Sequence, residues 1–505
     1  MFQHLSFLHD TFPSGFLWSS GTSAFQTEGA WDQEGKGPSI WDHFIHSSVN
    51  ANSSARTANV ASDSYTRWEE DVEALELLGV RSYSFSLSWP RLFPDGHAGS
   101  QPNAAAVDHY SRLIERLLQS KIEPIVTIHH WDLPQVLQEN YGGWKNHTLV
   151  GLFEEYAAFC FRTFGGRVRY WLTMHNPYLV AVHGYGTGLH APGERGGPSG
   201  SLIVAHNLIR AHAKAWHTYN THFRPTQKGK VSIALGTHWV EPRRGQATAD
   251  NIELCQKSIE AVLGWFAHPI FSDGDYPVSL KTKHGATMPI FTPEEKLWVQ
   301  KTADFFSLSF GPNNLRLGQN LIQYGQTVTP DLRRVLSWIK LEYGNPRVLV
   351  AEGGWFSEAK VSCIAVFSFP AIKFDGVQVF GYSAWSLVDA FEWNYGYAVR
   401  RGLFYIDFSQ QNRTRAPKTS AQYYQRIIAD NGFLSDETFG EVKGRFPCDF
   451  HWGVADSTLQ VKNRKTDFIV EMSDNGADIV FCCCCRSTST LSHHSLLTPV
   501  STAGT

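Results

Sequence analysis

Three polar residues stand where apolar stretches of the sequence end. Tyr170–Met174 is an apolar run typical of a buried strand, and His175 and Asn176 follow it directly. Pro177 has no backbone N–H to give to a neighbouring strand, so the strand ends before it. Glu352 follows a second apolar run. A carboxylate at the end of a strand can act as a nucleophile or a proton carrier, or it can simply form an ion pair.

The elements that must position these residues are strands and helices in alternation. Apolar runs of strand length alternate with amphipathic stretches of helical period. The expected strands are Phe16–Ser20, Ser82–Ser88, Glu123–Ile128, Tyr170–Met174, Val231–Leu235, Phe305–Phe310, Arg347–Ala351 and Val379–Ser383. The expected helices include Trp68–Leu78, Val107–Ser120, Thr148–Phe164, Leu202–Asn220, Ile252–Phe266 and Pro330–Glu342. Eight such units predict an α/β fold, a (β/α)8 TIM barrel, with its chemistry at the carboxyl ends of the strands.

Residues 12–433 resemble the family 1 β-glycosidases, with several motifs in the same order. The strand end at His175-Asn176-Pro177 resembles the Asn-Glu-Pro of that family, in which the Glu is the general acid/base. Val350-Ala-Glu-Gly resembles the family's Thr-Glu-Asn-Gly, in which the Glu is the nucleophile. The resemblance implies a family 1 barrel with Glu352 at the nucleophile position and Asn176 at the acid/base position.

The group that should donate a proton is absent from this pattern. The amide of Asn176 cannot protonate a leaving group, and loss of general acid catalysis lowers the rate by a factor of roughly 10²–10⁴. The imidazole of His175 could donate a proton near neutral pH. Because neighbouring residues of a strand point to opposite faces, however, we expect His175 to miss the leaving oxygen.

Further positions around Glu352 depart from the family pattern. Ser84 stands where the family has an arginine beside the nucleophile, and Gly353 replaces the Asn that follows the nucleophile. Ser309-Phe310 stands where the family has an Asn and a Tyr that bonds the nucleophile. We therefore expect Glu352 to lack the groups that hold its charge and orientation.

The residues by which the family holds a sugar are kept. By resemblance they are Gln26, His130, Trp131, Trp385, Glu392 and Trp393, and His175 belongs to the same candidate binding set. A carboxylate, an amide and indole groups around an apolar face suit a pyranose. Retention of these residues for packing alone is the alternative interpretation.

The ends of the sequence predict segments beyond one barrel. Residues 1–11 are interpreted as a leader and 12–433 as the barrel. Phe446–Trp452 and Gln460 repeat Phe12–Trp18 and Gln26 at one constant spacing. Residues 434–462 are therefore predicted to be a linker and the start of a second glycosidase-like domain, and the polar residues 463–505 to be disordered.

One connection inside the barrel also departs from the family. Val361–Pro370 occupies the place of a full helix before the eighth strand, but it is too short and is rich in β-branched and aromatic residues. Such a composition disfavours a helix. We interpret this segment as a deletion or a gene-model artefact.

Composition and short motifs exclude several functions. A net charge of −3 over 505 residues provides no basic surface for nucleic acid. No hydrophobic segment precedes Phe12, and no run of eighteen apolar residues occurs, so this sequence predicts neither a signal peptide nor a membrane span. The contiguous Cys482–Cys485 match no zinc spacing, and we expect no metal and no cofactor. Asn52, Asn146 and Asn412 begin Asn-X-Ser/Thr sequons, which carry glycans only in a secreted chain.

Within the glycosidases, the sequence resembles the klotho family. The residues that carry this likeness are Ser84, Ile122–Val126, Asn176–Ala181, His183–Gly188 and Leu189–Gly193. The resemblance implies a co-receptor on the extracellular side of the cell membrane that joins endocrine fibroblast growth factors to fibroblast growth factor receptors. Without a complete second domain we expect this function to be weak. The alternatives are a β-glucosidase-type hydrolase with residual retaining activity through Glu352, which would take β-glycosides, and a sugar-binding module.

Overall fold

The computed structural model describes residues 10–47, 57–311, 326–329, 331–354 and 368–433. The chain divides into two units, Met1–Gly440 and Glu441–Thr505, and all described residues lie in the first. Asn52, residues 361–367 and everything from 434 onward lie outside the described residues. The predictions made for those segments, and the domain boundaries, stay predictions.

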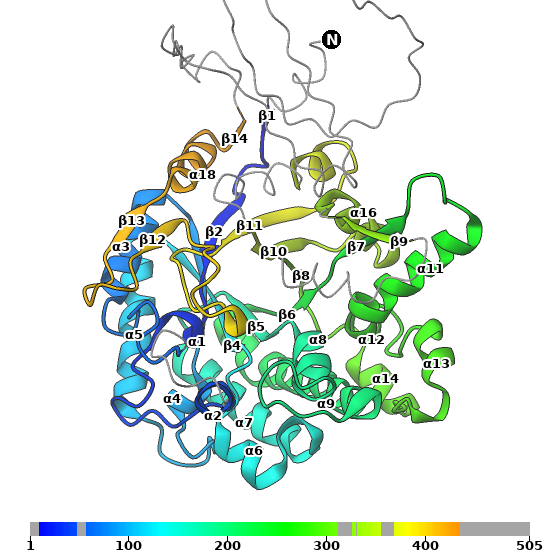
Figure 1. Cartoon of the computed structure of the whole chain (residues 1–505), viewed down its shortest axis with the longest axis horizontal. Coiled ribbons are helices and arrows are strands. Elements are labelled where there is room, and N and C mark those ends of the chain that lie inside the picture. Colours follow the sequence, from blue (N-terminus) through cyan, green and yellow to red (C-terminus); the bar gives the residue numbers. More distant parts are fainter. Residues whose placement is uncertain (1–9, 48–56, 312–325, 330, 355–367, 434–505) are drawn as a thin grey trace, which may run out of the picture. The chain divides into compact units, whose positions relative to one another are not determined.

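A closed barrel of eight parallel strands forms the centre of this unit (Figure 1). In barrel order the strands are β10 (Val348–Gly353), β11 (Val379–Trp385), β2 (Leu17–Gly21), β3 (Ser82–Ser86), β4 (Glu123–His129), β5 (Tyr170–His175), β6 (Lys230–Gly236) and β8 (Phe306–Phe310). Each neighbouring pair is parallel, including β10 with β8, which closes the barrel. All eight predicted strands are present within two residues of their expected bounds, so the predicted TIM barrel is confirmed.

Helices surround the strands, as Figure 1 shows. The longer ones are α3 (Trp68–Leu78), α5 (Ala104–Gln119), α7 (Thr148–Phe164), α9 (Gly197–Thr218), α11 (Ala249–Ile259), α16 (Leu332–Glu342) and α18 (Thr419–Asp430). Helix α5 buries Tyr110, Leu113, Ile114 and Leu117, the spacing of one helical face. The helix expected at Ile252–Phe266 is present as a continuous helical stretch, in which the π-helical segment Glu260–Gly264 joins α11 to α12 (Trp265–Phe271).

Shorter elements complete the unit. The short helices are α1 (Ala24–Thr27), α2 (Ile40–Ser47), α4 (Trp89–Leu92), α6 (Gln135–Tyr141), α8 (Pro177–Leu179), α10 (Arg224–Gln227), α13 (Val278–His284) and α14 (Pro293–Val299). Three antiparallel ribbons pair β1 (Asp10–Thr11) with β14 (Gly432–Phe433), β7 (Trp239–Pro242) with β9 (Gln326–Thr329), and β12 (Phe404–Ile406) with β13 (Arg415–Pro417). The first ribbon pairs the beginning of the described chain with its end.

The apolar core has two layers. The inside of the barrel is filled by a small cluster that includes Tyr170, Leu172, Leu349 and Ala351. A larger cluster fills the space between the strands and the helices. This packing fixes the strand ends, and with them the residues that follow each strand.

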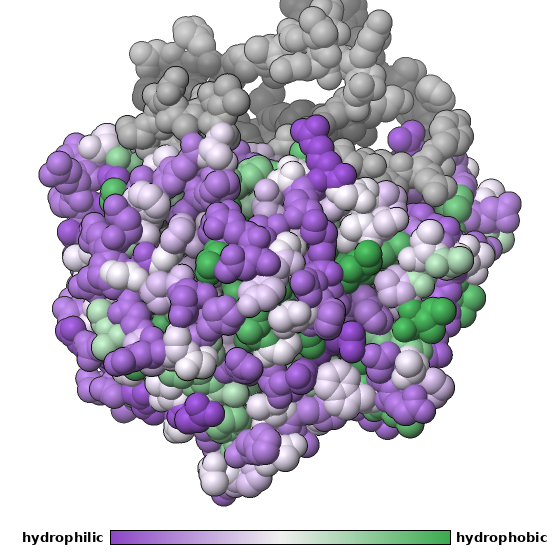
Figure 2. All heavy atoms as spheres, turned by 90° about the horizontal axis from the view of Figure 1, so that it is seen from below, coloured by the Kyte–Doolittle hydropathy of each residue, from purple (hydrophilic) through white to green (hydrophobic). Residues whose placement is uncertain are grey.

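The face shown in Figure 2 carries hydrophilic and hydrophobic residues side by side, and the hydrophobic ones do not cover the whole face. None of the helices in the described part of the chain combines the length and the apolar character needed to cross a membrane.

Candidate functional site

Glu352 lies at the end of β10 with donors on both oxygens of its carboxylate. Oε1 accepts a hydrogen bond from Arg401 at 2.9 Å. Oε2 accepts from Nε2 of His175 at 3.0 Å and from the Ser309 hydroxyl at 2.5 Å. Only 6% of Glu352 is exposed, so these contacts replace water.

These neighbours keep Glu352 ionised. Burial acts to raise the pKa of Glu352, but the hydrogen bond from His175 and the positive charge of Arg401 outweigh burial. The pKa therefore lies well below its ordinary value. The carboxylate is negatively charged at neutral pH, and its two oxygens accept hydrogen bonds from donors held in fixed positions.

Two irregularities in strand pairing turn His175 and Glu352 toward each other. The register of β5 on β6 shifts between Leu172 and His175, and that of β10 on β8 shifts between Val350 and Glu352. A bulge of this kind inserts one residue and redirects the side chains that follow it. The premise of regular alternation was therefore wrong, because His175 faces Glu352. The prediction that His175 misses the leaving oxygen stays a prediction.

The expectation that Glu352 lacks supporting groups was also wrong. Arg401 supplies a buried guanidinium from the loop after β11, although Ser84 replaces the family's arginine. Ser309 supplies a hydroxyl, although it replaces a different family residue. The sequence analysis missed Arg401, whose only signal was the pair Arg400-Arg401 in a stretch of aromatic and apolar residues.

Asn176 occupies the end of β5 in a left-handed conformation, with φ of 44°. Its backbone N–H donates to the Ala234 carbonyl at 2.7 Å. Its amide lies against Gly236, where an added Cβ would approach Asn176 Nδ2 to 2.3 Å. The predicted acid/base position is thus filled by a buried amide that is packed on β6.

Arg401 also contacts a second carboxylate. Its Nη1 lies 3.5 Å from Oε2 of Glu392, and the Gln26 amide donates to the same oxygen at 3.3 Å. Burial raises the pKa of Glu392 to about 7, although the charge of Arg401 acts in the opposite direction. For Arg401, burial acts to lower the pKa, but Glu392 and Glu352 outweigh it and raise the pKa. One arginine therefore joins the predicted nucleophile position to a predicted binding residue.

Aromatic side chains line the same place. His130 stacks on His175 with ring centroids 4.1 Å apart and lies 5.7 Å from the ring of Trp385. Trp131 lies 4.4 Å from Trp393, and its indole N–H donates to the His175 carbonyl at 2.7 Å. The predicted binding residues are thus brought together around Glu352, and all of them are buried.

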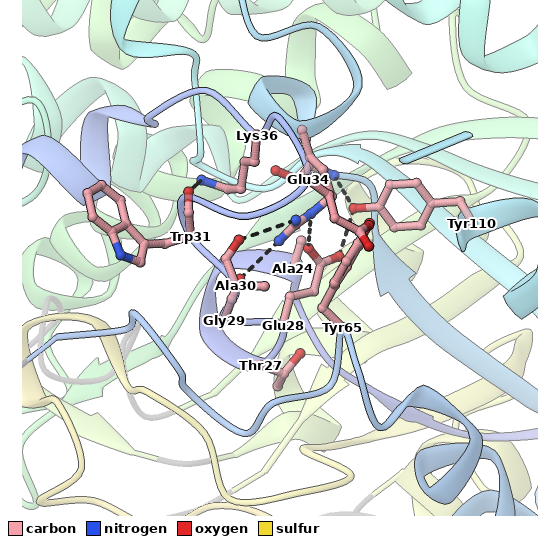
Figure 3. A network of polar contacts seen from close by, with 12 residues as sticks. Ala24, Thr27, Glu28, Gly29, Ala30, Trp31, Glu34, Lys36, Tyr65 and Tyr110 are labelled. Atoms are coloured by element: carbon pink, nitrogen blue, oxygen red, sulfur yellow. Dashed lines mark hydrogen bonds and ion pairs between the residues drawn. The ribbon is translucent and has the colours of Figure 1, made fainter. Parts of the chain in front are cut away.

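A buried polar network holds the loop that carries Gln26. Gln26 belongs to α1, and Glu28 follows this helix. Arg91 donates to Glu28 at 2.9 Å, and the Tyr110 hydroxyl donates to the other Glu28 oxygen at 2.7 Å. Figure 3 shows Glu28, Tyr110 and the Gly29–Ala30 backbone gathered in this network. The network fixes α1 and therefore the position of the Gln26 amide.

The remaining candidate residues lie away from this site. Asn412 is exposed and Asn146 is half-buried, with its side-chain oxygen accepting from the Thr148 N–H. Cys160 and Cys255 are free thiols. Within the described residues, no group of three or more His, Cys, Asp or Glu side chains is placed to hold a metal.

Known proteins resemble this chain both in sequence and in fold. The profile of glycosyl hydrolase family 1 matches residues 8–315 and 313–433. Among solved structures, an aphid myrosinase has a TM-score of 0.76 and 32% identity, covering 83% of this chain and 99% of the other. A rice β-glucosidase has a TM-score of 0.73 and 33% identity, covering 82% of this chain and 98% of the other.

Among proteins of this family, the chain is similar to klotho and lactase-like proteins. Beta-klotho of Mus musculus is 52% identical over 465 residues, which are 90% of this chain and 44% of beta-klotho. Klotho of Mus musculus is 50% identical over 488 residues, 91% of this chain and 48% of klotho. A lactase-like protein of Homo sapiens is 41% identical over 482 residues, 85% of this chain and 84% of that protein.

The predicted likeness to the klotho family is confirmed by these identities. The chain spans less than half the length of the beta-klotho and klotho relatives that it matches. The chain therefore belongs to glycosyl hydrolase family 1, as a klotho-type member of that family.

Proposed function

We propose that this barrel is a catalytically silent glycosidase domain that serves as a co-receptor module in signalling by endocrine fibroblast growth factors. By likeness to the klotho family, its partners would be the tail of the growth factor and the fibroblast growth factor receptor. Its place would be the extracellular side of the cell membrane.

The proposal that the site is catalytically silent rests mainly on the hydrogen bonds that Glu352 accepts. Both of its oxygens accept hydrogen bonds from buried donors, Arg401 on one side and His175 with Ser309 on the other. These three hydrogen bonds take up most of the roughly four lone-pair positions that a carboxylate offers. Attack through Oε2 would require one of its two hydrogen bonds, from His175 or from Ser309, to break.

The second support is the amide at position 176. A retaining glycosidase needs a carboxylic acid about 5–5.5 Å from the nucleophile to protonate the leaving oxygen. Asn176 cannot supply that proton at neutral pH. Without this group the first step of a retaining mechanism lacks its general acid and the second step lacks its general base.

Hydrolysis and binding assays test the two parts of this proposal. We expect no hydrolysis of cellobiose above the buffer background, because an unactivated leaving group needs a proton donor. We expect micromolar or tighter binding of a growth factor tail peptide by calorimetry, weakened when Trp393 or His130 is replaced by Ala. Cellobiose turnover at ordinary glucosidase rates would refute the silent site, and undetectable peptide binding would refute the co-receptor module.

One observation favours a second candidate function, a residual retaining hydrolase. Glu352 is ionised and held in place, which a nucleophile requires. A substrate with a strongly acidic leaving group needs little protonation, so it would bypass the missing acid. Hydrolysis of such a substrate that disappears in Glu352→Gln would support this candidate.

A further inference from the structure

Arg401 is the one arginine of the described residues that contacts both Glu352 and Glu392. Its Nη2 donates to Glu352 Oε1 at 2.9 Å, and its Nη1 lies 3.5 Å from Glu392 Oε2. Only 2% of Arg401 is exposed. The guanidinium therefore fills the space between two carboxylates that come from different loops of the barrel.

The backbone leaves room for this arrangement at Gly311. A Cβ added there would lie 2.7 Å from Glu352 Oε1 and 2.9 Å from Arg401 Nη2, closer than real Cβ atoms approach other atoms. Any residue with a side chain would push the pair apart. The backbone at Gly311 therefore lies directly against the contact between Arg401 and Glu352, and only glycine fits there.

The surrounding groups are those that recognise a polyhydroxylated ring. The Gln26 amide and the Glu392 carboxylate are hydrogen-bonded to each other at 3.3 Å. Among the described residues, no donor lies within hydrogen-bond distance of Glu392 Oε1, although this carboxyl is buried. The rings of Trp393 and His130 stack on each other, with their centroids 5.8 Å apart. A pyranose that reached both Glu352 and Glu392 would bring hydroxyl donors to oxygens that now face Arg401.

We propose that Arg401 is the specificity-determining residue of this site: its side chain occupies the position between Glu352 and Glu392, and so excludes a neutral pyranose. A sugar hydroxyl can also donate to a carboxylate, but only the guanidinium brings a positive charge that compensates the two buried acidic groups. The inference rests on the proposed silent function and names the residue that keeps sugar out. Removal of the guanidinium is then expected to create a sugar site.

The test is calorimetric titration with D-glucose of the wild type and of Arg401→Met, which keeps the apolar stem and removes the charge. We expect at least a tenfold gain in glucose affinity in the variant, lost again in Arg401→Met/Glu392→Gln. Arg415→Met is the matched control, since Arg415 forms a buried pair with Asp71 at 2.8 Å outside the site. This control is expected to bind glucose no better than the wild type.

The proposal is overturned if folded Arg401→Met, checked by circular dichroism, shows no gain in affinity. It is also overturned if the wild type already binds glucose as tightly as the variant. If the variant does not fold, the crystal structure of the wild type soaked in glucose tests the proposal instead. Glucose between Glu352 and Glu392 with Arg401 unmoved would overturn it, and Arg401 in place without sugar there would support it.

These outcomes are separate from those that test the silent site. Hydrolysis of cellobiose by the wild type would end the silent-site proposal, whichever protein binds glucose. Failure of Arg401→Met to gain glucose would end the present inference and leave the silent site standing. The wild type and Arg401→Met are compared over the same 505 residues, so neither experiment relies on a fragment.

Discussion

Nε2 of His175 lies 3.0 Å from Oε2 of Glu352, although the two residues are 177 positions apart in the sequence. In a regular strand His175 would face the opposite side of the sheet from the acid/base position, and the bulge in β5 brings it into the site. The imidazole thereby takes a place that a substrate hydroxyl or a leaving group would need. The barrel is that of a glycosidase, but its central carboxylate is engaged within the protein.

Replacement of Glu392 by Gln should change how stability depends on pH. A carboxyl whose pKa is about 7 in the folded state and 4.5 before folding binds more protons when folded. Its contribution is therefore largest at acidic pH and is lost as pH rises from about 4.5 to about 7. We expect the free energy of unfolding of the wild type, relative to Glu392→Gln, to fall by up to about 3 kcal/mol over this range. Urea unfolding at pH 5 and pH 7.5 measures this difference, and parallel pH profiles for the two proteins would contradict it.

Removal of Arg401 should destabilise the fold, and removal of its partner should restore part of the loss. Arg401→Met leaves the Glu352 carboxylate buried without its cation, which costs about 3–5 kcal/mol for a broken buried pair. The double variant Arg401→Met/Glu352→Gln should therefore lose less than the sum of the two single losses. Denaturant unfolding of the four proteins in a double-mutant cycle measures this coupling, and strictly additive losses would show that the pair is not coupled.

A methyl group at Gly311 should disturb the same pair by steric contact alone. Because the added Cβ would lie 2.7 Å from Glu352 Oε1, Gly311→Ala is expected to lower the free energy of unfolding by about 1–3 kcal/mol. Gly151→Ala is the matched control, since nothing lies within 4 Å of its added Cβ. Gly151 lies inside α7, so Ala there should stabilise by about 0.5–1 kcal/mol. Thermal unfolding distinguishes the two, and equal effects at both positions would contradict this account.

Restoring a carboxyl at position 176 should not by itself restore catalysis. Asn176→Glu supplies the missing acid, but His175, Ser309 and Arg401 still occupy the oxygens of Glu352. We expect the variant to hydrolyse p-nitrophenyl β-glucoside no faster than the wild type. A gain of a hundredfold or more would mean that loss of the acid alone silenced the site.

The barrel could be predicted from the sequence because its strands and helices are local patterns. Runs such as Tyr170–Met174 are apolar along their whole length, as strands buried on both faces must be. Helix α7 has its predicted bounds because its apolar residues repeat with helical period. The π-helical segment between α11 and α12 was not predicted, since it leaves the apolar period nearly intact.

The site was predicted less well because its geometry depends on irregular and distant features. The positions of Glu352, Gln26 and Glu392 followed from motifs. The direction of His175 did not, because a bulge leaves no mark in the pattern of apolar residues. Arg401 is 49 positions from Glu352 and reaches it from another loop, so only the folded chain brings the two together. These two residues are the ones that change the interpretation of the site.

Pre-steady-state hydrolysis of 2,4-dinitrophenyl β-glucoside tests the silent site most directly, because its leaving group needs almost no protonation and only the nucleophile is examined. If Glu352 does not attack, there is no burst of dinitrophenol, and the wild type and Glu352→Gln release it at the same slow rate. A burst close to one equivalent per protein, absent from Glu352→Gln, would show that Glu352 attacks the sugar and would contradict the account.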